Sequence, residues 1–125
     1  MSRSKHRVTV TLPYPPTANH YVKHTRSGQH YKTDEAHAFE RAAWYAVKQG
    51  KFKAFPGDAR LAVEIAVFPP DRRRRDIANL EKVTTDSLQR AGLFPDDEAI
   101  DDLRLVRHHE PRIPGGQVVV TITEL

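Results

Sequence analysis

Residues 61–92 read LAVEIAVFPPDRRRRDIANLEKVTTDSLQRAG, and this stretch decides the fold. Apolar side chains at every second position of Leu61–Val67 predict a half-buried strand, which stops at Pro69. Along Ile77–Ala91 the apolar and small side chains recur at spacings of three and four, which predicts a helix that Gly92 closes. A strand followed by a helix of this kind favours a sheet with helices packed on it.

The flanking sequence adds one strand and one helix before this stretch and two strands after it. Thr33 is the expected N-cap of the first helix, and Gly50 is its expected C-terminal cap. Residues 20–32 are polar, aromatic and basic, with a turn at Ser27-Gly28. The expected additional strands lie at Val8–Leu12, Leu103–Arg107 and Val118–Ile122. The order β-α-β-α-β-β predicts an α+β (mixed α/β) fold, a single domain over residues 1–125 with one mixed sheet and two main helices.

Composition limits which side chains could bind a metal ion and where in the cell the protein is expected. The chain has 125 residues and no cysteine, so a bound metal would be held by carboxylate, imidazole or backbone oxygen. No stretch approaches the roughly 20 consecutive apolar residues of a membrane span. We therefore expect a cytoplasmic protein without a membrane partner.

Charge is distributed unevenly along the chain. Residues 1–53 carry ten lysines and arginines against three acidic residues, whereas residues 54–125 carry ten against thirteen. A basic first half together with four consecutive arginines favours a polyanionic partner. A basic solvated surface without any ligand is the alternative that composition leaves open.

The arginine run at Arg72, Arg73, Arg74 and Arg75 meets a carboxylate at Asp76. Each guanidinium can bind phosphate through two hydrogen bonds. A carboxylate within such a cationic rim can hold a divalent cation against the same phosphate. This junction is therefore the first candidate site.

A second acidic element, Asp96 and Asp97, follows the predicted second helix and would contribute to the site if the chain returns towards Asp76. Hard cations prefer such oxygen ligands, and Mg²⁺ often takes only one or two protein carboxylates. If the bound phosphate is part of a phosphodiester that is cleaved, Lys82 would neutralise the negative charge that develops on it. The alternatives are a solvated helix lysine paired with Asp86, and an exposed acidic turn.

These segments together resemble the RusA family of Holliday junction resolvases, which are small phage and prophage endonucleases. The resemblance rests on residues 71–82, on Asp86-Ser87-Leu88 with Ala91-Gly92, on Asp96-Asp97, on the proline-rich residues 11–19 and on Gly115-Gly116 with the final strand. It implies a homodimer that binds four-way junction DNA and cleaves two strands in recombination and repair. It also implies a requirement for Mg²⁺, with Mn²⁺ as a substitute, and a bacterial, phage or prophage origin.

The residue roles that the resemblance implies follow the matching positions. The catalytic residues fall on Asp76, Lys82 and Asp97. The metal ligands fall on Asp76, Asp97 and Asp96. The DNA-binding residues are Arg72, Arg73, Arg74, Arg75, Lys23 and Asn19.

The chain departs from the family pattern at one position. The family has two aspartates separated by one residue, whereas this sequence has Asp76 followed by Ala78. Three explanations stand open: an engineered inactive variant, a natural member that uses Asp86 or Asp96 instead, and a homologue that binds junctions without cleaving them. An RNA-directed or purely architectural basic protein is a further alternative.

Overall fold

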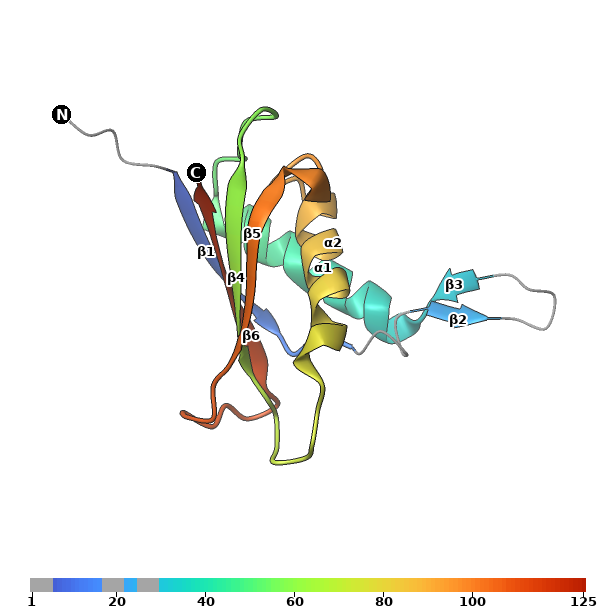
Figure 1. Cartoon of the computed structure of the whole chain (residues 1–125). Helices are drawn as coiled ribbons and strands as arrows, with labels where there is room; N and C mark the ends of the chain where they lie inside the picture. Colours follow the sequence, from blue (N-terminus) through green and yellow to red (C-terminus); the bar gives the residue numbers. More distant parts are fainter. Residues whose placement is uncertain (1–5, 17–21, 25–29) are drawn as a thin grey trace.

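The computed structural model describes residues 6–16, 22–24 and 30–125. In these ranges a four-stranded sheet carries two helices, and a short hairpin projects from the N-terminal end of the first helix (Figure 1). The elements are β1 (Arg7–Pro13), β2 (Val22–His24), β3 (His30–Lys32), α1 (Asp34–Gly50), β4 (Leu61–Phe68), the 3-10 helix η2 (Ile77–Leu80), α2 (Glu81–Arg90), the 3-10 helix η3 (Asp97–Ala99), β5 (Ile100–Arg107) and β6 (Gln117–Glu124). The expected α+β fold with one mixed sheet and two main helices is confirmed.

The main sheet has the strand order β1-β6-β4-β5. Strand β6 pairs antiparallel with both β1 and β4, and β4 pairs parallel with β5. The register aligns apolar side chains across three strands, because Val10 and Ile65 both lie opposite Val120. All three residues are buried, so these rows form the part of the core that the helices cover.

Helix α1 begins where the sequence predicts and ends differently. Thr33 is its N-cap, since its hydroxyl accepts a hydrogen bond from the Ala36 amide at 3.2 Å. The prediction that Gly50 caps the other end is wrong: Gly50 lies within the helix, and Lys51 takes the left-handed conformation with φ 51°. Gly50 serves close packing, because a Cβ there would come within 2.2 Å of the Phe52 ring.

The second helix and the region before α1 also differ from expectation in detail. The stretch predicted as one helix from Ile77 starts as the 3-10 turn η2, and the α-helical part begins at Glu81. Gly92 closes α2 with a φ of 88°, as predicted. Strands β2 and β3 pair as an antiparallel hairpin within residues 20–32, where sequence analysis expected only a turn. Three-residue strands are too short to show an alternating apolar pattern.

The crossover from β4 through α2 to β5 places two loops at the same end of the strands of the sheet. Because β4 and β5 are parallel, their carboxyl ends lie at the same end of the sheet. The arginine loop (residues 69–76) leaves β4 there, and the β5–β6 loop (residues 108–116) leaves β5 there (Figure 1). The edge beyond the carboxyl ends of parallel strands is a common place for ligand sites. Within the described ranges, no helix is long and apolar enough to cross a membrane.

Replacing Gly116 with alanine is expected to destabilise the fold by roughly 2–4 kcal/mol, through left-handed strain plus a steric clash. Gly116 has a φ of 74°, and a Cβ there would lie 2.8 Å from the Pro70 nitrogen. Gly115 is the matched control, because its φ of 77° is similar but a Cβ there meets nothing within 4 Å. Urea unfolding of both variants measures the difference, and equal losses of stability would contradict the clash.

Candidate functional site

The arginine loop is folded around Asp71. One carboxylate oxygen, Oδ1, accepts a hydrogen bond from the Arg73 amide at 2.9 Å, and the other, Oδ2, accepts one from Arg75 Nη2 at 2.9 Å. These two contacts hold the pKa of Asp71 below its usual value. The loop therefore keeps one carboxylate ionised, and that carboxylate orders the loop.

The four arginines do not have the same environment. Arg72, Arg73 and Arg74 are exposed. The Arg75 side chain is only 25% exposed, and its guanidinium lies 5.6 Å from the centroid of the Tyr14 ring. Burial raises the pKa of Tyr14, although Arg75 opposes that shift. Arg75 thus anchors the loop, while the other three guanidiniums face solvent.

Asp76 links the arginine loop to the following helical turn. It is the N-cap of η2, and its Oδ1 accepts a hydrogen bond from the Ala78 amide at 3.1 Å. Asp76 and Ala78 are both exposed. A carboxylate at position 78 would therefore lie in the open, two residues from the Asp76 carboxylate.

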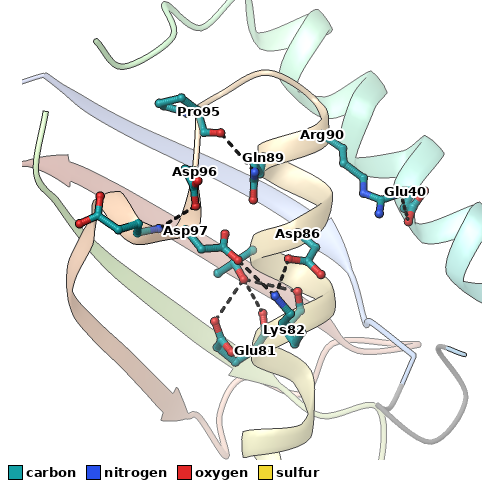
Figure 2. Close-up of polar contacts among 11 residues, drawn as sticks. Glu40, Glu81, Lys82, Asp86, Gln89, Arg90, Pro95, Asp96 and Asp97 are labelled. Atoms are coloured by element: carbon teal, nitrogen blue, oxygen red, sulfur yellow. Dashed lines mark hydrogen bonds and ion pairs between the residues drawn. The ribbon is translucent and has the colours of Figure 1, made fainter. Parts of the chain in front are cut away.

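Lys82 is the centre of a compact polar cluster, hereafter the Lys82 cluster, which consists of Lys82, Asp86 and Asp97 (Figure 2). Its ammonium lies 3.1 Å from Asp86 Oδ1 and 3.3 Å from Asp97 Oδ2. Hydrogen bonding and attraction to Asp86 are the main reasons that the pKa of Lys82 is raised, and Asp97 adds to them. The lysine is therefore held as a cation. The pairing with Asp86, which sequence analysis gave as the alternative to a functional role, is present together with a contact to Asp97.

Asp97 has a carboxylate oxygen without a partner. Its Oδ2 contacts Lys82, whereas its Oδ1 is buried and has no hydrogen-bond partner in the described structure. Burial raises the pKa of Asp97, and the neighbouring Asp86 carboxylate adds to this, while Lys82 opposes it. An unpaired buried carboxylate oxygen is costly unless a donor or a cation reaches it. This oxygen is the strongest indication of a cation site in the cluster.

Asp96 has a structural contact of its own. It is the N-cap of η3, and its Oδ1 accepts a hydrogen bond from the Glu98 amide at 3.0 Å. This cap shapes the turn from which Asp97 projects towards α2. Asp96 Oδ2 is not engaged in that bond.

The structure brings some of the predicted site residues together and leaves others apart. Lys82 and Asp97 meet directly, and Asp86 joins them. Within the described ranges, the Asp76 side chain bonds to the Ala78 amide, and the expected approach of Asp76 to Asp97 is not seen as a contact. No group of three or more histidine, aspartate or glutamate side chains that could hold a metal ion occurs among these residues. Lys23 lies on β2, and Asn19 lies outside the described residues.

Arg60 is a residue that sequence analysis missed. Its guanidinium donates to the Glu98 carbonyl oxygen at 2.6 Å, to the Glu98 carboxylate at 3.1 Å and to Asp101 Oδ1 at 2.6 Å. These contacts fasten the segment that follows Asp97 to the start of β4. Only the three-dimensional contact identifies this role, because Arg60 lies 38 residues from Glu98 in the sequence.

Replacing Arg60 with alanine is expected to loosen the turn that carries Asp97. Amide hydrogen exchange in residues 96–101 should accelerate several-fold, while exchange in β6 changes little. Arg104→Ala is the control, because Arg104 is an exposed arginine that pairs with Asp102 on β5. Unchanged exchange at Glu98 in the Arg60 variant would show that the guanidinium does not order this turn.

Comparison with known proteins identifies the family of this chain. Residues 13–123 match the family described as Endodeoxyribonuclease RusA. The chain is 38% identical over 114 residues to the crossover junction endodeoxyribonuclease rusA of Enterobacteria phage HK97, over 91% of this chain and 92% of that protein. The chain belongs to the RusA family. Crossover junction endodeoxyribonucleases RusA of Shigella sonnei (strain Ss046) and Escherichia coli (strain K12) are each 35% identical to it over 120 residues, or 94% of each chain.

The family assignment confirms the resemblance that was inferred from the arginine run, the acidic pair and the proline-rich opening. The matched range includes the arginine loop, the Lys82 cluster and the β5–β6 loop. All three features thus belong to the part of this RusA-family chain that is shared with its relatives.

Proposed function

We propose that this chain is a structure-selective endodeoxyribonuclease that resolves four-way (Holliday) DNA junctions in recombination and repair. The observation that carries the proposal is the match to the RusA family over residues 13–123, since the relatives are named crossover junction endodeoxyribonucleases. The exposed arginines beside Asp76 support it, because phosphate backbones are bound mainly by such side chains. The organisms of these relatives suit a protein of phage or prophage origin that acts in the bacterial cytoplasm.

The proposed cofactor is Mg²⁺, with Mn²⁺ as a substitute. Asp76 and Asp97 would hold the cation, and Asp96 would assist. The unpartnered Asp97 Oδ1 fits such a ligand set, because hard divalent cations prefer carboxylate oxygen. When bound, the cation supplies charge stabilisation for phosphodiester cleavage. Lys82 would offset negative charge on the phosphate, and the arginine loop would hold the DNA strand in place.

Ala78 gives the alternative function its support. The family pattern has a second aspartate at this position, and alanine offers neither a metal ligand nor a base. The alternative is a module that binds junctions without cleaving them. Asp86 or Asp96 would have to replace the missing carboxylate if the chain is active as it stands, and Asp86 already contacts Lys82.

The proposed quaternary state is a homodimer, and strand β5 is the surface that favours it. Strand β5 lies at the edge of the sheet, and Leu103 and Val106 on it are 42% and 38% exposed. An unpaired strand edge with apolar side chains favours pairing with another chain. Leu103→Lys is expected to shift the chain from dimer towards monomer in sedimentation equilibrium, whereas Arg104→Lys is not. A Leu103→Lys chain that remains dimeric at the same concentration would contradict this surface.

A synthetic four-way junction tests the proposed function against its alternatives. Binding is measured by gel shift in Ca²⁺ or EDTA, beside a duplex of equal length at fixed salt, and cleavage is then measured in Mg²⁺. Preference for the junction with paired cuts supports the nuclease. Preference without cuts supports the binding module. Equal affinity for junction and duplex would overturn both and favour an architectural protein.

A further inference from the structure

The end of β5 and the β5–β6 loop contribute basic side chains that were not among the predicted DNA-binding residues. Arg107 ends β5, His108 and His109 follow it directly, and Arg112 lies further along the loop. Arg107 Nη2 donates a hydrogen bond to the Arg75 carbonyl oxygen, which ties the end of β5 to the arginine loop. The residue from which the β5–β6 loop starts thus contacts a residue of the arginine loop that lies 32 positions earlier.

Further contacts fix the position of the β5–β6 loop. The His108 ring stacks on the Phe68 ring with 4.9 Å between centroids and 15° between planes, and the His108 amide donates to the Val67 carbonyl oxygen at 2.9 Å. At the other end of the loop, Gly116 packs so tightly on Pro70 that a Cβ would not fit. Both ends of the loop are therefore anchored to the chain that leads into the arginine loop. The β5–β6 loop is consequently held next to the arginine loop.

Between the loops lies a hollow of about 380 Å³, hereafter the basic hollow. Its lining consists of Pro69, residues 71–75, Arg107, His108, His109 and Arg112. It therefore contains six arginines and two histidines against the single carboxylate of Asp71. Both oxygens of Asp71 already accept hydrogen bonds from Arg73 and Arg75.

Three arginines of the basic hollow lack acidic partners. Within the described part of the chain, Arg72, Arg74 and Arg112 make no ion pair, and all three are exposed. Guanidiniums held around one concave surface repel each other unless an anion lies between them. The lining has Pro69 as its one aliphatic residue, so it offers little apolar surface for insertion into a lipid interface. A polymeric phosphate with several charges in a row is the matching ligand.

We propose that the β5–β6 loop and the arginine loop form a two-sided clamp that grips the phosphodiester backbone of one DNA arm in the basic hollow. The inference rests on the proposed function in taking DNA as the substrate, and it adds a second loop to the binding surface. Arg112 and His109 grip the strand from one side, and Arg72 and Arg74 grip it from the other. Because Asp76 is the last residue of the arginine loop, the clamp would hold the strand next to the proposed catalytic residues.

The test is the salt dependence of junction binding by the full chain carrying both His109→Gln and Arg112→Gln. Both side chains are exposed, so the variant should fold, and thermal unfolding checks this. Affinity at moderate salt should fall on the order of tenfold, and the slope of log K against log salt should become shallower by about 1 to 2, because each phosphate that is no longer neutralised removes roughly one unit. The control is Arg104→Gln, which removes an exposed arginine that is paired with Asp102 outside the hollow.

A double variant with the slope of the unaltered chain would overturn the clamp, whatever its affinity. Binding to lipid would also overturn the clamp. That outcome is a stronger affinity of the unaltered chain for vesicles of equimolar phosphatidylserine and phosphatidylcholine than for DNA, which the double variant loses. If the unaltered chain shows no preference for junctions, the proposed function fails. The same titration on duplex DNA then still decides whether the two loops share a phosphate-binding surface.

Discussion

Introducing a carboxylate by Ala78→Asp is expected to raise Mg²⁺-dependent cleavage of a four-way junction by at least ~100-fold. Ala78 is exposed on η2, and its amide already donates to Asp76. The new carboxylate would lie beside that of Asp76, where it could share a divalent cation and a phosphate oxygen. Junction binding in Ca²⁺ should change far less, because the arginine loop is unaltered. The measurement is the single-turnover cleavage rate at saturating protein.

The control for this prediction is Ala78→Asn, which adds almost the same volume without the charge. A large gain with aspartate and none with asparagine would assign the effect to the carboxylate. If the unaltered chain already cleaves at a rate similar to that of the Ala78→Asp variant, then position 78 is not essential. In that case Asp86→Asn in the unaltered chain is informative, since loss of cleavage would show that Asp86 supplies the missing ligand.

Three of the four strands of the main sheet, β1, β4 and β6, were predictable because each has a local alternating signal. Every second residue of β1, β4 and β6 is buried by the helices on one face, and the same period is visible in the sequence. The end of α1 was not predictable in the same way. Glycine at position 50 is typical of a helix cap, but the Phe52 ring needs that space and the left-handed residue is Lys51. The packing of the side chain two residues further on outweighed the usual preference for a glycine cap there.

The candidate site was predictable in its residues and less so in its geometry. Lys82 and Asp97 were identified from their positions in a family pattern, and they do meet. The expected convergence with Asp76 was inferred from the return of the chain alone, which says nothing about where each side chain points. Arg60 and the β5–β6 loop were missed for a related reason. Their roles depend on contacts between distant segments, and an isolated arginine carries no periodic signal.

Asp97→Asn is expected to lower Mg²⁺-dependent cleavage by at least ~100-fold in an active chain, such as the Ala78→Asp variant, while the protein stays folded. The amide can still accept the hydrogen bond from Lys82, so the local geometry should persist. At neutral pH the variant should be as stable as its parent or more stable. The reason is that burial raises the pKa of Asp97, so its ionised form costs stability in the folded state.

The pH dependence of unfolding separates this effect from a general loss of structure. Because the pKa of Asp97 is raised in the folded state, its contribution is most favourable below its ordinary value of 3.8 and declines as pH rises through the folded pKa. The parent should therefore lose stability relative to Asp97→Asn over that window. Asp101→Asn gives the opposite sign, since hydrogen bonds from Arg60 lower the pKa of Asp101, and its contribution declines as pH falls. Urea unfolding over a pH series that starts below 3.8 and rises to neutrality measures both, and parallel trends would contradict the assigned environments.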